Sequence, residues 1–174
     1  MEFDKQKYAF VFQKTLEDKR IKKPQENFKI RLFLQRAENS LLIAKEIKCI
    51  QPKKDQATKL HWNYWAITIS YYSMLYAAKA AILKKGYEVH DHDAAFIALG
   101  HLLVPNELEK EDLEILRQSH KIFEEEYVHS FKDAQTESHI ARYSAIKTYT
   151  ERRQEEIVEN ARKFVAKTIL LLED

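Results

Sequence analysis

Residues 62–86 contain no proline and no acidic residue, and their only glycine is the last residue. Two stripes recur there at helical spacing: a small-residue stripe of Ser70, Ser73, Ala77 and Ala80, and an aromatic stripe of Trp65, Ile69, Tyr72 and Tyr76. Small residues three and four apart let a second helix approach closely, and aromatic residues at this spacing usually belong to a core. We therefore predict a central helix, buried on most of its circumference and capped by Gly86.

Apolar residues at three- to four-residue spacing predict further helices on both sides of this stretch. They cover about residues 25–50, 91–104, 105–130 and 151–172. Residues 51–59 read as a connecting loop, and Asp91 or Asp93 can cap the short helix that follows the central one. Residues 131–138 fit either a hinge or an uninterrupted helix, and the helical pattern resumes at Ile140.

The first 24 residues form a separate pattern. Residues 3–20 are loosely amphipathic and predict a short accessory helix, and the basic cluster Lys19, Arg20, Lys22 and Lys23 follows it. A charge run before a proline is usually a solvated linker, so we interpret the cluster as one. The expected organisation is an accessory helix and linker over residues 1–24 and a helical bundle over residues 25–174.

Composition limits the classes of function. The chain of 174 residues has 29 basic and 27 acidic side chains, a formal net charge of +2, so any RNA-binding surface must be local, and nothing indicates DNA binding. The single Cys49 fits a reducing compartment. The charged N-terminus predicts no signal peptide, and Asn63 and Lys79 interrupt the central apolar helix, so we expect a cytoplasmic protein without a membrane span.

Metal and cofactor chemistry has little support in the sequence. His90 and His92 are two residues apart at a helix start, where their side chains diverge, and no third ligand stands at a fixed near spacing. There is no glycine-rich phosphate loop and no pair of Glu-x-x-His motifs of the kind that forms carboxylate-bridged metal sites in helical bundles. We predict no metal site and no cofactor.

The run Ser70-Tyr-Tyr-Ser-Met-Leu-Tyr-Ala-Ala-Lys-Ala80, followed by a Lys-Gly end at Gly86, resembles the second helix of HEPN domains (higher eukaryotes and prokaryotes nucleotide-binding). Residues 161–165, Ala-Arg-Lys-Phe-Val, resemble the closing helix of that family. The resemblance implies an all-α fold, an antiparallel four- or five-helix up-and-down bundle, here with an extra N-terminal helix. It also implies a homodimer, an RNA or nucleotide ligand, and a nucleotidyltransferase as a possible partner protein.

Many HEPN domains are metal-independent ribonucleases that carry an arginine followed, after four to six intervening residues, by a histidine on the penultimate helix. In that chemistry a base takes the proton of the RNA 2′-hydroxyl and a cation stabilises the charge that builds on phosphorus. No histidine falls in the window after Arg117 or Arg142. Arg142 and Tyr149, seven residues apart on nearly the same helix face, are the best aligned catalytic candidates, and His139 and Tyr143 are candidate ligand-binding residues beside them.

The degenerate motif favours one of two functions. The first is a nucleotide- or RNA-binding module that works beside a nucleotidyltransferase, the partner that the resemblance implies. The alternative is an active, toxin-like ribonuclease that uses Arg142, although an unperturbed tyrosine with a pKa near ~10 is a poor base at neutral pH. An interaction module that uses its aromatic N-terminal helix is a third possibility.

Overall fold

The computed structural model describes residues 4–23, 28–49, 56–135 and 151–173, of which residues 48–49, 56–61 and 123–135 are described by their backbone alone. The elements in chain order are α1 (Lys5–Glu17), β1 (Ile21–Lys22), α2 (Lys29–Cys49), α3 (Gln56–Lys84), β2 (Glu88–Val89), α4 (His92–Leu102), α5 (Lys110–Gln135) and α6 (Glu151–Glu173).

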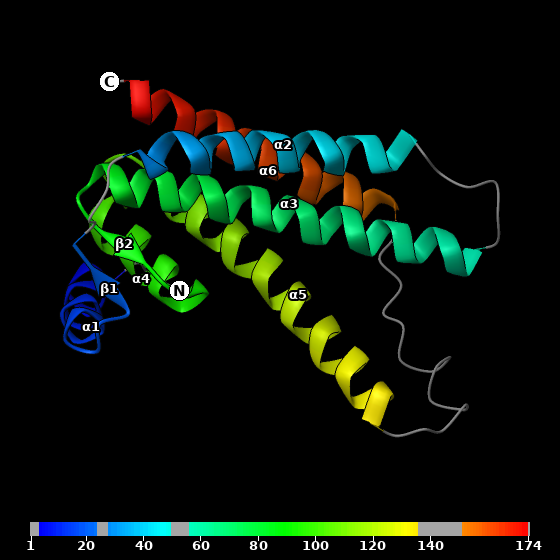
Figure 1. Ribbon diagram of the computed structural model, residues 1–174, viewed down its shortest axis with the longest axis horizontal. Helices are drawn as coiled ribbons and strands as arrows, with labels where there is room; N and C mark the ends of the chain where they lie inside the picture. The colour runs from blue at the N-terminus through cyan, green and yellow to red at the C-terminus, as the bar shows by residue number, and fades with distance from the viewer. Residues whose placement is uncertain (1–3, 24–27, 50–55, 136–150, 174) are drawn as a thin grey trace.

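Four long helices form the bundle. Helices α2, α3, α5 and α6 alternate in direction along the chain, and α3 contacts each of the other three (Figure 1). This is the up-and-down bundle that the sequence predicts, with α1 as the extra N-terminal helix. Helix α3 begins at Gln56, six residues before the predicted start, and ends at Lys84, just before Gly86 with its positive φ of 82°.

The small-residue stripe of α3 is buried, and one of its members contacts the α2 backbone directly. Ser70, Ser73, Ala77 and Ala80 are all fully buried. The Ser73 hydroxyl donates to the Ala37 carbonyl oxygen of α2 at 2.7 Å, so a buried polar group is satisfied by the helix that packs against it. The predicted role of this stripe is confirmed.

The aromatic stripe of α3 was predicted to lie in the core, but the structure leaves much of it partly exposed. Tyr71, next to the stripe, is fully buried, but Tyr72 and Tyr76 are only half-buried and Trp65 is 46% exposed. These side chains pack at the edge of the core and keep part of their surface open. The stripe therefore belongs to the outer surface of the bundle, because no described helix covers it completely.

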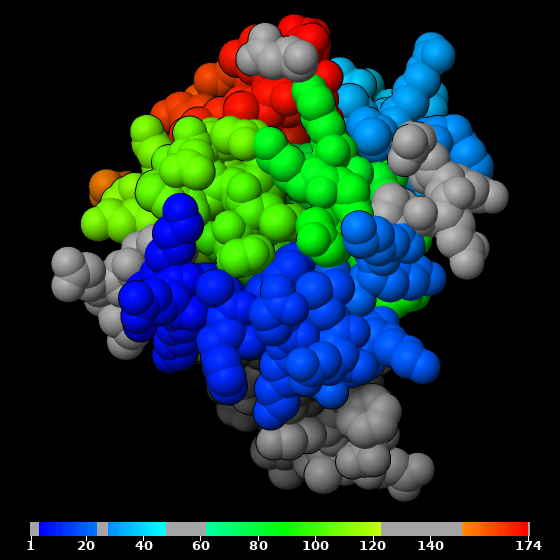
Figure 2. All heavy atoms as spheres, turned by 90° about the vertical axis from the view of Figure 1, so that its left-hand side faces the viewer, coloured from blue at the N-terminus to red at the C-terminus, as the bar shows by residue number. Residues whose placement is uncertain are grey.

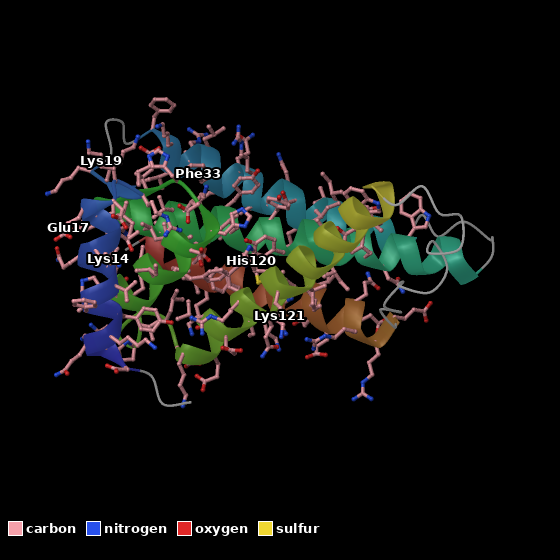
Figure 3. The ribbon with its side chains drawn as sticks, turned by 90° about the horizontal axis from the view of Figure 1, so that it is seen from below. Lys14, Glu17, Lys19, Phe33, His120 and Lys121 are labelled. Atoms are coloured by element: carbon pink, nitrogen blue, oxygen red, sulfur yellow. The ribbon has the colours of Figure 1, made fainter. Side chains whose placement is uncertain are left out.

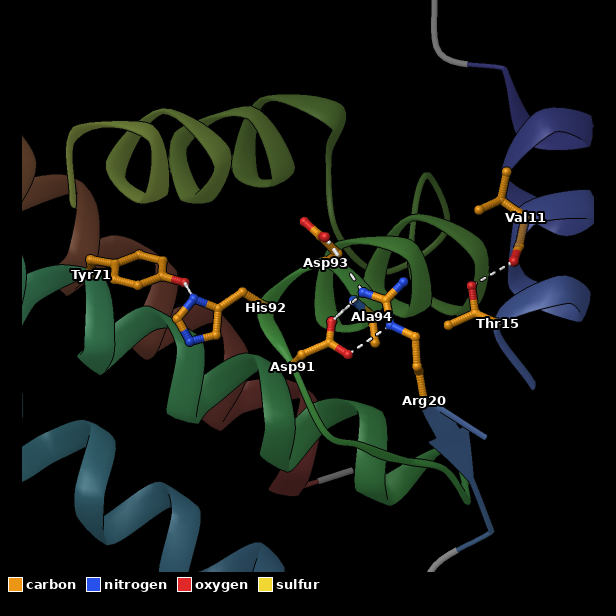
Figure 4. Close-up of polar contacts among 8 residues, drawn as sticks. All are labelled: Val11, Thr15, Arg20, Tyr71, Asp91, His92, Asp93 and Ala94. Carbon is orange, nitrogen blue, oxygen red and sulfur yellow. Dashed lines mark hydrogen bonds and ion pairs between the residues drawn. The ribbon is translucent and has the colours of Figure 1, made fainter. Parts of the chain in front are cut away.

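The N-terminal segment is docked on the bundle, and the prediction of a solvated basic linker is wrong for its first part. Phe12 and Ile21 are buried in the common core, and β1 pairs antiparallel with β2 through Ile21 and Val89 (Figure 1). Figure 2 shows the N-terminal segment, in blue, packed against the green part of the chain. The Arg20 guanidinium donates to both carboxylate oxygens of Asp91, at 2.8 and 2.6 Å (Figure 4). The segment thus closes one end of the bundle.

The start of α4 follows the prediction, whereas that of α5 does not. Asp91 caps α4 by accepting from the Ala94 backbone N–H at 2.9 Å. Helix α5 begins at Lys110 instead of Pro105, because the preceding residues form turns closed by hydrogen bonds to the Leu103 carbonyl oxygen. The Asp112 carboxylate accepts from the Glu109 N–H at 2.9 Å, which fixes the new start as half of a capping box.

The later helices agree with the sequence as far as they are described. Helix α5 continues without interruption to Gln135, so residues 131–135 are helical, and the predicted resumption at Ile140 lies outside the described residues. Helix α6 spans the predicted 151–172 and buries Ile157, Ala161, Phe164 and Val165.

Helix α3 is long and apolar enough to be a candidate membrane span over Trp62–Lys84, contrary to the expectation from Asn63 and Lys79. However, 78% of the most apolar window is buried inside the bundle. The core helix of a soluble protein passes the same test of length and composition, and a soluble domain fits this burial.

Candidate functional site

Two rows of side chains line the surface where α2 and α3 lie antiparallel. Each row has a spacing of i, i+4 and i+7, which places its members on one helix face. The rows are Lys29, Phe33 and Arg36 on α2, and Tyr72, Tyr76 and Lys79 on α3. The Phe33 and Tyr76 rings stack with centroids 6.4 Å apart and planes 15° apart, and the Arg36 Cζ atom lies 5.7 Å from the Tyr76 ring centroid.

The rings continue from this pair toward α4. The Tyr72 and Tyr76 centroids are 6.2 Å apart, and those of Tyr72 and His92 are 6.3 Å apart with nearly perpendicular planes. Phe33, Tyr72, Tyr76 and His92 are all half-buried. We call these four rings, together with the exposed Arg36, the aromatic face.

A buried polar cluster supports the inner end of the aromatic face. The Tyr71 hydroxyl and His92 Nδ1 are 2.8 Å apart, and one donates to the other according to the histidine tautomer (Figure 4). His120 of α5 is only 8% exposed, and its ring centroid lies 4.9 Å from that of His92 and 5.4 Å from that of Phe96. Figure 3 shows His120 on α5 and Phe33 on α2, the two helices that flank α3.

The contact with Tyr71 is made by Nδ1 of the His92 ring, so the tautomer of the ring decides which group donates. In the tautomer that accepts from Tyr71, the proton is on Nε2. In the other tautomer, Nδ1 carries the proton and donates to the Tyr71 hydroxyl oxygen. The cluster therefore couples the tautomer of the ring at the edge of the aromatic face to the direction of this hydrogen bond.

The ionisable groups near the face keep distinct states at neutral pH. Burial raises the pKa of Tyr72 above its ordinary value, and the neighbouring phenols of Tyr76 and Tyr64 add to the effect, so Tyr72 stays a neutral hydrogen-bond donor. Burial lowers the pKa of Lys79, and the carboxylates of Asp91 and Glu88 partly offset that shift. Lys79 is thus a cation held partly out of water at one end of its row.

The catalytic and ligand-binding residues predicted from the family motif lie outside the part of the chain that the structure describes. Arg142, Tyr149, His139 and Tyr143 all lie in residues 136–150, outside the described residues, and their roles remain predictions. Within the described ranges, no group of three or more His, Cys, Asp and Glu side chains is placed to hold a metal ion. The site that the structure adds is therefore an aromatic one.

Sequence reasoning missed the pairing of His92 with His120, because 28 residues and a turn separate them along the chain. The two i, i+4, i+7 rows, in contrast, can be recognised in the sequence as residues that share a helix face. Lys29, Phe33 and Arg36 combine cations with a ring on one face of α2, a pattern that differs from the leucine and alanine residues of its core face. The spacing alone does not show that this face is left open.

The fold and the face together define a small helical-bundle domain with a half-open row of rings along its central helix. A family model described as HEPN domain matches residues 53–170, which is more than half of the chain. The protein belongs to the HEPN domain family, a family of nucleotide- and RNA-related modules. A comparison with curated proteins gave no match.

Proposed function

We propose that this protein is a cytoplasmic nucleotide- or RNA-binding module and that the aromatic face is its binding surface. The observation that supports this proposal is the row of half-buried rings from Phe33 through Tyr76 and Tyr72 to His92. Aromatic side chains that pack into a core at one edge and stay open at the other provide platforms for stacked bases. Such stacking contributes about 1–3 kcal/mol per base and tolerates any base.

The charges around the rings favour a ligand with phosphate groups. Arg36 is exposed beside the Tyr76 ring, and Lys79 lies one helical turn further along α3. A base stacked on Tyr76 places its sugar and phosphate near Arg36, whose planar guanidinium suits phosphate oxygens. Because the net charge of the chain is only +2, binding has to come from this local arrangement and not from a general attraction.

The proposal is tested by fluorescence anisotropy with a labelled single-stranded adenylate RNA, in chelator, with wild-type protein and two variants. Tyr76→Ala removes a stacking ring, and we expect a loss of affinity of roughly 5- to 100-fold. Arg36→Gln removes one phosphate contact, and we expect weaker binding with a salt dependence reduced by about one counterion. Tyr76 is half-buried, so circular dichroism and thermal unfolding establish that each variant is folded.

Two matched controls stand elsewhere on the surface. Arg31→Gln removes an exposed arginine from another face of α2, and Phe10→Ala removes a ring that is 74% exposed on α1. Both should bind as the wild type does. Equal affinity of wild type, Tyr76→Ala and Arg36→Gln would refute the aromatic face as the binding surface.

The same assay, with Arg142→Ala added, separates binding from cleavage. RNA that stays intact in chelator supports a binding module. RNA that is cleaved by the wild type and remains intact with Arg142→Ala would instead favour the ribonuclease predicted from the sequence, because the arginine would then be needed to stabilise the charge on phosphorus.

A further inference from the structure

The N-terminal segment contacts the bundle immediately before His92, the ring at one end of the aromatic face. The backbone N–H of His90 donates to the Arg20 carbonyl oxygen at 3.1 Å, and the Arg20 N–H donates to the Thr15 carbonyl oxygen of α1 at 3.1 Å. The Arg20 side chain also donates to the Asp91 carboxylate (Figure 4). The backbone and the side chain of one residue therefore both join α1 to the residues that precede His92.

Asp91 carries this connection into α4. Its Oδ1 atom accepts from Arg20 Nη2 at 2.6 Å and from the Ala94 backbone N–H at 2.9 Å, while its Oδ2 atom accepts from Arg20 Nε at 2.8 Å. Two parallel bonds from an arginine fix the orientation of a carboxylate as well as its position. The oriented carboxylate in turn holds the first turn of α4, to which His92 belongs.

The His92 ring is held from a second side by α3. Its Nδ1 atom lies 2.8 Å from the hydroxyl oxygen of the fully buried Tyr71. The hydrogen bond from Arg20 lowers the pKa of Asp91, and the charge of His92 adds to that effect, so the carboxylate and the ring sense each other. The ionisable groups around the ring are Asp91 and Asp93 in its own segment, Tyr71 and Tyr72 of α3, His120 of α5 and, through Asp91, Arg20.

A ligand with phosphate groups on the aromatic face would meet negative charge at this end if the two aspartates had no partner. Burial lowers the pKa of Lys79, and the Asp91 carboxylate is close enough to offset part of that shift, so its charge is felt at the end of the α3 row. Arg20 supplies the compensating positive charge, through its pair with Asp91 and a longer contact of 3.4 Å from Nη2 to Asp93 Oδ2.

We infer that Arg20 is a positioning residue of the aromatic face. It holds His92 in place through Asp91, and it neutralises the carboxylate that would otherwise repel the phosphates of a bound ligand. The inference rests on the proposed function and adds to it a residue that acts on the face from the N-terminal segment. The hydrogen bonds that the structure gives to the Arg20 guanidinium go to Asp91 and Asp93, so Arg20 acts through these carboxylates.

A double-variant cycle with the labelled adenylate RNA tests this role. Arg20→Gln should weaken binding by roughly 3- to 10-fold, because it leaves the Asp91 carboxylate without its partner beside the ligand. Asp91→Asn removes that charge and keeps a side chain that can cap α4, so R20Q/D91N should regain most of the wild-type affinity. The control Lys19→Gln removes the same charge from an exposed position in the same segment and should bind as the wild type does.

An NMR titration of His92 in the ligand-free protein distinguishes an electrostatic effect from a loss of folding. Arg20→Gln exposes His92 to the full charge of Asp91 and should raise the pKa of the ring, and R20Q/D91N should reverse that rise. His101, at the other end of α4, packs against Phe12 of α1 with ring centroids 4.4 Å apart. An unchanged His101 signal in these variants therefore shows that α1 stays docked.

Two results of the binding assay would overturn the inference. One is an affinity of Arg20→Gln equal to that of the wild type. The other is an affinity of R20Q/D91N as low as that of Arg20→Gln, because Arg20 would then contact the ligand itself or serve only to dock α1. A wild type that binds no RNA would refute the proposed function, and the His92 titration would then decide this inference alone. An unchanged pKa of His92 in Arg20→Gln would overturn it in either case.

Discussion

The contact between Tyr8 of α1 and Gly100 of α4 gives a sharp test of how the N-terminal segment is held. A Cβ atom placed on Gly100 would lie 2.2 Å from Cε1 and 2.4 Å from Cδ1 of the Tyr8 ring. Real Cβ atoms do not approach other atoms so closely, so the ring occupies space that only a glycine leaves. In a second contact, Arg117 Nη2 donates to the Tyr8 hydroxyl at 2.9 Å.

Gly100→Ala therefore produces two opposing effects on the free energy of unfolding. Gly100 is in a helix interior, where alanine is favoured over glycine by about 1 kcal/mol. The clash with Tyr8 costs about 1–3 kcal/mol, because the ring has to move and lose its packing. We expect a net destabilisation of about 1 kcal/mol in the wild type, and a stabilisation of about 1 kcal/mol in a Tyr8→Ala background, where the obstacle is gone.

Urea denaturation of the wild type, Gly100→Ala, Tyr8→Ala and the double variant measures the coupling free energy between the two positions, which should be about 2 kcal/mol. The slope of each transition must be compared first, since a changed slope would mean that the segment and the bundle no longer unfold together. An effect of Gly100→Ala that has the same sign and size in both backgrounds would refute the packing of Tyr8 on Gly100.

Two further predictions concern pH. The Arg20 guanidinium holds the pKa of the Asp91 carboxyl below its ordinary value of 3.8. The contribution of this ion pair to the free energy of unfolding is therefore complete above that pH and is lost as pH falls through the lower folded-state pKa. Arg20→Gln should reduce this acid dependence in denaturant titrations. Burial, with a smaller effect of Lys5, lowers the pKa of His101 below 6.5, so the free energy of unfolding should fall as pH drops below 6.5. His101→Phe keeps a ring against Phe12 and should remove that part, whereas an unchanged pH profile would contradict the burial of His101.

Local signals in the sequence account for most of the bundle. The small residues of α3 at three- and four-residue spacing predicted a close neighbour, and the Ser73 hydroxyl bonds the Ala37 backbone of α2. Asp91 was one of two predicted caps of α4, and its side chain accepts from Ala94. The signals behind both predictions come from residues within one or two turns of each other, which is the range over which spacing and capping rules hold.

Contacts between distant segments could not be predicted in the same way. The ion pair of Arg20 with Asp91 joins residues 71 positions apart, and a basic residue before a proline gives no sign of such a partner. The same holds for Tyr8 and Gly100, which are 92 positions apart and whose packing requires a glycine. Such pairings are set by the tertiary arrangement, which single-chain periodicity does not contain.

The aromatic stripe shows why the candidate site was not predicted, although Tyr72 and Tyr76 were assigned to one stripe. Tyr72 and Tyr76 have the spacing of a core stripe, and in a helix covered on all sides they would be one. Their exposure is decided by α2, which places Phe33 and Arg36 beside Tyr76 where a core-covering helix would place leucines. Since Arg36 cannot be buried without a partner, this edge of α3 has to stay in contact with solvent or with a ligand that carries negative charge. The partial exposure of the face therefore follows from the pairing of two helices, and neither helix reveals it alone.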